Sequence, residues 1–172
     1  PFHGCGWQLV PEALRGLGVK HLYCVEEQMV LDGTFPTVAS PNPENPEGFY
    51  LAIELADKVG ADFILGTDPD SDRVGIMVRG ADGKFIAVTG NQTGVLLLDY
   101  LIGAMRRAGK MPEHPYFLKT IVTTEMARKV AESNDVTCYD TFTGFKFMAE
   151  KKNALEAAGE GKVIFSYEES YG

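Results

Sequence analysis

The most chemically suggestive stretch of the chain is an acidic segment, Gly66-Thr67-Asp68-Pro69-Asp70-Ser71-Asp72-Arg73. Three carboxylates occupy alternate positions in it, at Asp68, Asp70 and Asp72, and the guanidinium of Arg73 follows at once. Carboxylates so close together repel one another unless a cation neutralises them, and their oxygens suit a hard divalent ion such as Mg2+. An arginine beside such an ion is suited to bind phosphate. The segment therefore predicts a magnesium site at which phosphate chemistry takes place.

Other kinds of acidic loop contain similar residues. An EF-hand requires Gly at the sixth position and Glu at the twelfth, but counting from Asp68 these positions hold Arg73 and Arg79. A phosphatase with an aspartate nucleophile and a glycosyltransferase with a D-x-D metal site both stay open. A plain solvated acidic turn is disfavoured, because it would give no reason for the arginine.

The flanks of the acidic segment predict the elements that hold it. The apolar runs Phe63–Leu65 and Val74–Val78 are short and partly β-branched, so both are expected to be buried strands. Asp82-Gly83 is a hairpin signal between Val74–Val78 and Phe85–Val88. The carboxylates are therefore expected on a loop between two rigid elements.

The rest of the chain alternates between helical and extended patterns, which favours an α/β fold with parallel βαβ units. The helices are expected around the apolar stripe Leu9–Leu17 and over Gly48–Val59, Gln92–Arg107, Thr124–Glu132 and Phe145–Ala158. Thr124 is expected to cap the start of its helix. Further strands are expected over His21–Val25, Phe117–Val122, Val136–Asp140 and Val163–Ser166. Asp32 to Pro46 carries four prolines and is expected to be an irregular loop. A domain boundary is placed at the hairpin, giving domains 1–83 and 84–172.

Two polar segments follow predicted strands, where α/β sheets bind ligands. Thr143-Gly144-Phe145-Lys146 opens a helix, so its backbone N–H groups and Lys146 suit a phosphate; a capped helix with a solvated lysine is the plainer alternative. Glu168-Glu169-Ser170 offers carboxylates and a hydroxyl, which suit sugar hydroxyls, against the alternative of an acidic surface turn.

Composition narrows the classes of partner. Apolar residues make up 45% and charged residues 23% of the 172, and the net charge of −8 argues against a nucleic-acid partner. The three cysteines are scattered, which favours a reducing cytoplasm, and no apolar run is long enough to span a membrane. The chain begins at Pro1 and stops at Gly172, so both ends are expected to be cut.

Together these segments resemble the α-D-phosphohexomutase superfamily of phosphoglucomutases and phosphomannomutases. The matching pieces occur in the family's order along the whole chain. They are Pro1-Phe2-His3-Gly4-Cys5-Gly6, the loop from Phe35-Pro36 to Pro41-Asn42-Pro43-Glu44, the acidic segment, Thr143-Gly144-Phe145-Lys146 and Glu168-Glu169-Ser170-Tyr171-Gly172.

The resemblance implies most of the second and third of four domains: two consecutive three-layer α/β domains with mixed, mainly parallel sheets, both truncated. It implies that Asp68, Asp70 and Asp72 hold Mg2+ and that Arg73 and Lys146 assist phosphoryl transfer. The substrate, a hexose phosphate, would be bound by Thr143, Gly144, Glu168 and Ser170. The first domain, with its phosphoserine, and the fourth would be absent, so the chain alone is expected to be inactive. Glucose 1-phosphate to glucose 6-phosphate conversion is the expected reaction. Phosphomannomutase, phosphopentomutase and an aspartyl-phosphate phosphatase are the alternatives.

Overall fold

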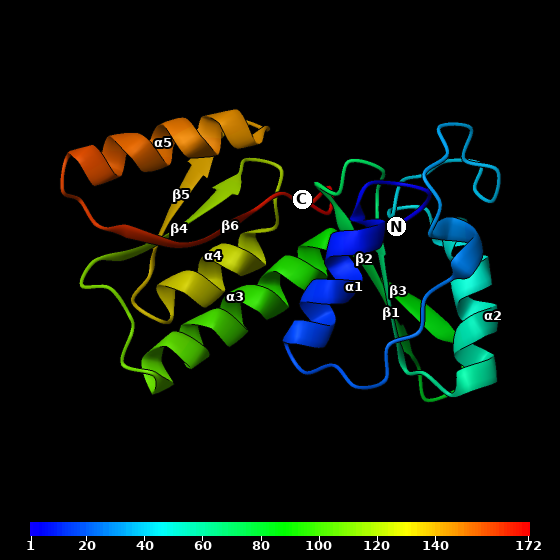
Figure 1. Cartoon of the computed structure of the whole chain (residues 1–172). Coiled ribbons are helices and arrows are strands. Elements are labelled where there is room, and N and C mark those ends of the chain that lie inside the picture. The colour runs from blue at the N-terminus through cyan, green and yellow to red at the C-terminus, as the bar shows by residue number, and fades with distance from the viewer. The chain divides into compact units, whose positions relative to one another are not determined.

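The computed structural model describes all residues, 1–172, and divides into two compact units, Pro1–Thr89 and Gly90–Gly172. Each unit contains its own three-stranded sheet (Figure 1). The division falls between Thr89 and Gly90 rather than after Gly83, because Phe85–Val88 forms strand β3 and pairs with β2 of the first unit. The two units are described separately below.

The sheet of the first unit is antiparallel throughout, in the order β1-β2-β3. Its strands are β1 (Phe63–Thr67), β2 (Val74–Arg79) and β3 (Phe85–Val88). The expected α/β fold is confirmed, but in this unit the expectation of a mainly parallel sheet is wrong. The acidic loop and the Asp82-Gly83 turn are too short for the crossover that parallel neighbours need, so each reverses the chain. The predicted hairpin is confirmed.

Two helices accompany this sheet, α1 (Gly6–Gly16) and α2 (Tyr50–Val59), with short 3-10 turns at Glu26–Gln28 and Pro46–Phe49. The unit's buried core consists of Phe2, Phe49, Ala56, Ile64 and Met77. The Phe2 and Phe49 rings meet edge to face, with their centroids 5.1 Å apart. This pair attaches the chain's first residues to the loop ahead of α2.

The predicted strand at His21–Val25 is wrong. The segment is extended in part but joins no sheet. It lines a largely apolar cavity of about 590 Å³ together with residues of α1, α2 and β1. Leu22, Cys24 and Val25 are half-buried there without ladder hydrogen bonds, whereas Tyr23 is exposed.

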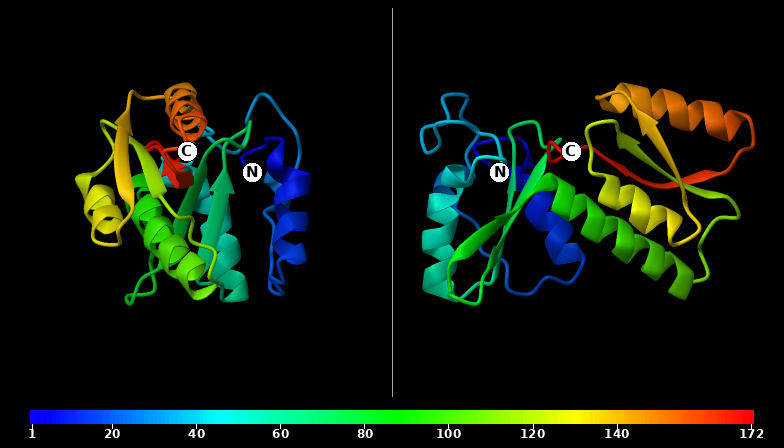
Figure 2. Two further views of the ribbon diagram at one scale, coloured as in Figure 1. Left: turned by 90° about the vertical axis from the view of Figure 1, so that its left-hand side faces the viewer. Right: turned by 180° about the vertical axis from the view of Figure 1, so that it is seen from behind.

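The sheet of the second unit is parallel, in the order β5-β4-β6. Its strands are β4 (Pro115–Thr120), β5 (Thr137–Thr141) and β6 (Lys162–Tyr167), and its helices are α3 (Gly90–Arg107), α4 (Glu125–Glu132) and α5 (Phe145–Ala157). Helix α5 covers one face of the sheet, whereas α3 and α4 cover the other (Figures 1 and 2). The parallel βαβ expectation is confirmed here.

The second unit has three layers, namely helix α5, the sheet, and helices α3 and α4. Strand β4 lies in the middle layer, and both of its faces are buried. Phe117 faces a cluster that includes Leu98 of α3 and Ala127 of α4. Tyr116 and Leu118 face the opposite way and pack with residues of α5. A central parallel strand covered on both faces needs such a continuous apolar run. All three strands end at one edge of the sheet, from which the unit's polar loops emerge.

Local signals define the start of α4. The Thr124 hydroxyl accepts a hydrogen bond from the Met126 N–H, and this confirms the predicted threonine cap. The side-chain oxygen of Asn91 accepts in turn from the Thr124 N–H. Among all the helices of the chain, none combines the length and the apolar character that crossing a bilayer would require.

Candidate functional site

The three aspartates of the acidic loop lie together at the end of β1. One carboxylate oxygen of each of Asp68, Asp70 and Asp72 lies within 4.8 Å of the corresponding oxygens of the other two. Asp68 is fully buried, whereas Asp70 and Asp72 are exposed. A set of converging hard oxygen donors, one anchored inside and two open to solvent, fits a Mg2+ ion that keeps some of its waters.

Arg73 fixes the buried carboxylate. Its backbone N–H donates to Asp68 Oδ1 at 3.0 Å, and its side-chain Nε donates to Asp68 Oδ2 at 2.9 Å. Arg73 Nε also lies 3.5 Å from Asp72 Oδ1. Each carboxylate oxygen has two lone pairs, so Asp68 can still ligate a metal while it accepts from Arg73. The side chain of Arg73 remains about one-third exposed, at 34%.

The charges of the loop are mutually dependent. Burial opposes ionisation of Asp68, but the hydrogen bonds from Arg73 outweigh it, and the Asp68 pKa is lowered. The pKa of Asp72 is raised, first by its hydrogen bond to Asp68, then by burial and by the charges of Asp68 and Asp70. The carboxylates thus resist being ionised all at once, which is the condition that a bound cation relieves.

The N-terminal turn contacts the acidic loop at Pro69 and Ser71. The Cys5 N–H donates to the Pro69 carbonyl at 2.8 Å, and the Cys5 Sγ lies 3.6 Å from the Ser71 hydroxyl. His3 is buried in the same turn, with Nε2 2.8 Å from the Thr37 hydroxyl and Nδ1 3.2 Å from the Val30 carbonyl. These contacts give His3 a structural place within the turn.

The proline-rich loop also reaches the acidic loop. An open hollow is lined by residues of both, namely Ser40, Pro41, Asn42, Asp68, Pro69, Asp70 and Arg73. Only folding brings the two loops to one hollow.

In the second unit, the two predicted binding segments meet at the carboxyl edge of the sheet. The Gly144 N–H donates to Glu168 Oε1, which joins the turn ahead of α5 to the loop after β6. Thr143 precedes this contact and is exposed, whereas Ser170 is half-buried two residues after Glu168. Lys146 is exposed in the first turn of α5, with Nζ 5.8 Å from the centroid of the Phe147 ring.

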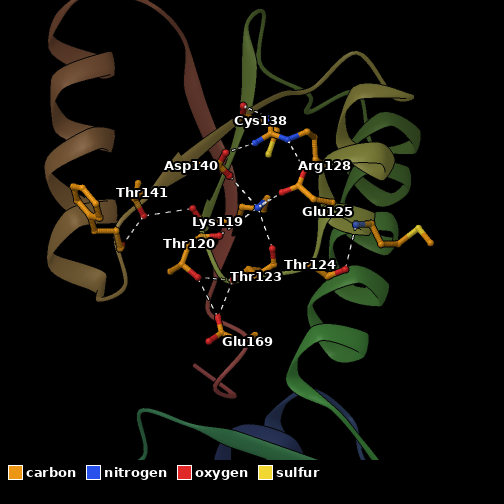
Figure 3. A network of polar contacts seen from close by, with 12 residues as sticks. Lys119, Thr120, Thr123, Thr124, Glu125, Arg128, Cys138, Asp140, Thr141 and Glu169 are labelled. Carbon is orange, nitrogen blue, oxygen red and sulfur yellow. Dashed lines mark hydrogen bonds and ion pairs between the residues drawn. The ribbon is translucent and has the colours of Figure 1, made fainter.

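Sequence reasoning missed a polar network at the same edge. Lys119 and Thr120 at the end of β4, Thr123 in the following turn and Glu169 form a connected set of hydrogen bonds (Figure 3). Thr120 and Thr123 are buried. The signal available in the sequence was a lysine in an otherwise apolar strand, followed by threonines at the strand's carboxyl end.

Two family models match the chain and leave only a short gap between them. Residues 1–83 match the phosphoglucomutase/phosphomannomutase α/β/α domain II, and residues 89–172 match domain III of the same family. The chain belongs to the phosphoglucomutase/phosphomannomutase family. The acidic loop lies in the region that matches domain II, and Lys119, Gly144 and Glu168 lie in the region that matches domain III.

Curated phosphoglucomutases are similar to this chain over almost its whole length. The proteins of Staphylococcus aureus strains MRSA252 and USA300 are each 39% identical to it over 170 residues, which is 99% of the chain. The chain spans only 30% of the length of these relatives.

Solved structures of the family share the fold. A phosphoglucomutase/phosphomannomutase family protein from Burkholderia thailandensis has a TM-score of 0.72 at 18% identity and matches 99% of this chain and 32% of its own. A putative phosphomannomutase from Thermus thermophilus has a TM-score of 0.69 at 20% identity, with coverages of 99% and 35%. At these identities the likeness concerns the family's fold alone.

Proposed function

We propose that this chain serves as the second and third domains of a phosphoglucomutase-type enzyme that interconverts glucose 1-phosphate and glucose 6-phosphate. The observation that carries the proposal is the cluster of three aspartate carboxylates with Arg73 held against Asp68. The phosphoserine that exchanges the phosphoryl group would come from a first domain, and a fourth domain would hold the substrate's phosphate. We also assign the protein to the cytoplasm, in keeping with its three free cysteines.

Asp68, Asp70 and Asp72 would hold Mg2+, and the ion would neutralise negative charge on the phosphoryl group as it transfers. The Arg73 side chain is about one-third exposed while its Nε is fixed on Asp68, so it can stabilise the same phosphoryl group without moving far. Lys146 would add a second positive charge from the first turn of α5.

The sugar would be recognised in the second unit by its hydroxyl groups. Glu168 accepts hydrogen bonds, and Ser170 both donates and accepts. Thr143 and Gly144 would complete the binding loop beside them. The reaction would pass through a sugar bisphosphate that binds in two orientations. Groups that do not distinguish one phosphate from the other therefore suit it.

Phosphomannomutase and phosphopentomutase activities are the nearest alternatives, because the carboxylate cluster and Arg73 would serve them equally. An aspartyl-phosphate phosphatase is a different class, with Asp68 or Asp70 as nucleophile. The engagement of both Asp68 oxygens by Arg73 weighs against Asp68 in that role.

The proposal is tested by titrating the 172-residue chain with Mg2+ in a calorimeter. We expect weak binding by the wild type and a loss of about tenfold or more in Asp70→Asn, because one anionic ligand is removed. Asp99→Asn is the matched control, since it removes one negative charge from an exposed site on α3. Equal affinity of the wild type and Asp70→Asn would overturn the metal assignment.

A second arm measures turnover. The chain alone should not convert glucose 1-phosphate, whereas the chain joined to the family's first and fourth domains should. Conversion by the chain alone would contradict the four-domain proposal. A stable acyl phosphate on Asp68 or Asp70 would favour the phosphatase instead.

A further inference from the structure

The Glu169 side chain is held by two buried threonines. Its Oε2 accepts from the Thr120 hydroxyl at 3.1 Å and from the Thr123 hydroxyl at 3.0 Å (Figure 3). The two hydroxyl oxygens lie 2.7 Å apart. Thr120 and Thr123, called the threonine pair below, are 0% and 3% exposed. Glu169 is thus bound at a desolvated site, where hydrogen bonds to a charged acceptor are strong.

The threonine pair is itself fixed from the interior of the sheet. Lys119 is completely buried, and its Nζ donates to the Thr123 carbonyl at 3.0 Å and to the Thr120 carbonyl at 3.3 Å. The Thr123 N–H donates to the Thr120 carbonyl at 3.1 Å and closes the turn. The two hydroxyls therefore stand on a backbone turn whose carbonyls are tied to one ammonium group.

The charge of Lys119 is neutralised where it lies. Its Nζ is 2.7 Å from Glu125 Oε1 and 3.0 Å from Asp140 Oδ1. Burial disfavours the ammonium, but these hydrogen bonds and charges outweigh it, and the Lys119 pKa is raised. Arg128 pairs with both carboxylates as well. The network joins β4, α4 and β5, and the interactions of the Lys119 ammonium are all with groups of the protein that hold these elements together.

The backbone around Glu169 also packs against the start of α3. A Cβ placed on Gly90 would lie 2.1 Å from the Glu169 carbonyl oxygen and 2.9 Å from the Tyr171 nitrogen, so the loop rests directly on the first residue of α3. The Glu168 N–H donates to the Gly172 carbonyl at 2.8 Å. The loop after β6 is therefore closed by this hydrogen bond and lies against the start of α3.

The two neighbouring glutamates have different partners. Glu168 accepts from the Gly144 N–H, whereas Glu169 accepts from the threonine pair. Between them they join the loop after β6 to the turns after β4 and β5. Fixing Glu169 restricts the backbone from which the Glu168 carboxylate and the Ser170 hydroxyl project.

We propose that Glu169 is a positioning residue, and that its hydrogen bonds to the threonine pair hold Glu168 and Ser170 in the geometry that binds sugar hydroxyls. The sugar-binding part rests on the proposed function; the anchoring of the loop does not. Glu169 touches no substrate in this scheme and acts only through the loop. Freeing it adds conformations in which Glu168 and Ser170 no longer face the same ligand.

The test compares Glu169→Gln and Thr123→Val in the 172-residue chain. The first removes the anionic acceptor, and the second replaces a hydroxyl by a methyl group of similar size. Amide exchange of the Glu168 and Gly144 N–H groups reports the anchor, and titration with glucose 1,6-bisphosphate reports sugar binding. Thr137→Val, at an exposed position of β5, and Glu160→Gln, at an exposed position after α5, are matched controls.

We expect each variant to accelerate Glu168 amide exchange and to weaken bisphosphate binding, by about three- to tenfold in each case, with Mg2+ affinity unchanged. A variant that combines Glu169→Gln with Thr123→Val should lose little more bisphosphate affinity than the weaker-binding single variant, because the two side chains form one hydrogen-bonded unit. Thr123→Ser restores a hydroxyl and should recover most of the binding, which a loss of packing alone would not allow.

Unchanged exchange in both variants would overturn the anchor. Faster exchange with unchanged bisphosphate affinity would overturn the positioning role. Failure of the wild type to bind any sugar phosphate would count against the proposed function, while the exchange data would still decide whether Glu169 anchors the loop.

Discussion

Gly4 lies directly against Pro69, so that a Cβ added to Gly4 would fall 2.2 Å from the Pro69 Cα and 2.5 Å from its carbonyl oxygen. The two residues are far apart in sequence, and their contact places the N-terminal turn behind the carboxylate loop. The following Cys5 N–H donates to that same Pro69 carbonyl. The absence of a side chain at residue 4 is therefore a requirement of the carboxylate cluster.

Gly4→Ala should displace Pro69 and with it the aspartates on either side. We expect a loss of about 1–3 kcal/mol in the free energy of unfolding, because backbone rather than a flexible side chain must move. Calorimetry should show weaker Mg2+ binding as well. Gly33→Ala is the control, since nothing lies within 4 Å of its added Cβ. Similar Mg2+ affinity in both variants would mean that the turn does not support the loop.

Glu168→Gln should lower turnover in the protein that joins this chain to the first and fourth domains. Sugar hydroxyls would lose a charged acceptor, at a cost of about 1–3 kcal/mol, which is about ten- to a hundredfold in kcat/KM. Both reaction directions should suffer equally, and the dependence on Mg2+ should not change. Steady-state kinetics in both directions, with Glu160→Gln as the control variant, checks this expectation. Normal turnover, or a change confined to the Mg2+ requirement, would remove Glu168 from the sugar site.

Lys119→Met should destabilise the 172-residue chain by about 2–4 kcal/mol, because it leaves two buried carbonyls and two carboxylates without their cation. The carboxylates of Glu125 and Asp140 are partly exposed and keep Arg128, which limits the loss. Urea unfolding measures it, and Lys110→Met at an exposed position is the control. A loss equal to that of the control would show that the Lys119 network adds no stability.

Stability should fall between about pH 9 and pH 11 because of Cys138. Burial raises the pKa of this thiol from 9.0 to about 11, with smaller effects from Arg128 and Asp140. The unfolded thiol ionises first as the pH rises, so the unfolded state binds fewer protons in this window and gains in relative stability. The contribution of the neutral Cys138 thiol to the free energy of unfolding is fully present below pH 9 and is lost by pH 11. This contribution amounts to about 1–3 kcal/mol.

Cys138→Ala removes this contribution. Its free energy of unfolding should therefore decline less than that of the wild type between about pH 8 and about pH 10.5 in urea titrations. Tyr167 is present in both proteins, and its pKa is raised to about 12, mainly by burial and to a smaller extent by the charge of Cys138. If the free energy of unfolding changed with pH in the same way in the wild type and in Cys138→Ala, Cys138 would not be the cause of the loss.

Local sequence was sufficient for the elements that carry their own start and stop signals. The Asp82-Gly83 turn and the Thr124 cap depend on residues close together in the chain, and both formed as predicted. The apolar runs around the acidic loop also formed strands, but the prediction that these strands are buried is wrong, because Phe63, Leu65 and Val78 are exposed. The carboxylate cluster also followed from spacing alone, since alternate positions on one short loop cannot lie far apart.

Tertiary structure decided what lies around those elements. His21–Val25 has the composition of a strand, but a strand also needs a partner edge, and sequence composition does not specify one. The contact of Gly4 with Pro69 and the hold of the threonine pair on Glu169 join residues separated by dozens of positions. The chain's sequence determined which groups could do chemistry; the packing of one segment on another determined which of them are held in place, because long-range contacts depend on the whole fold.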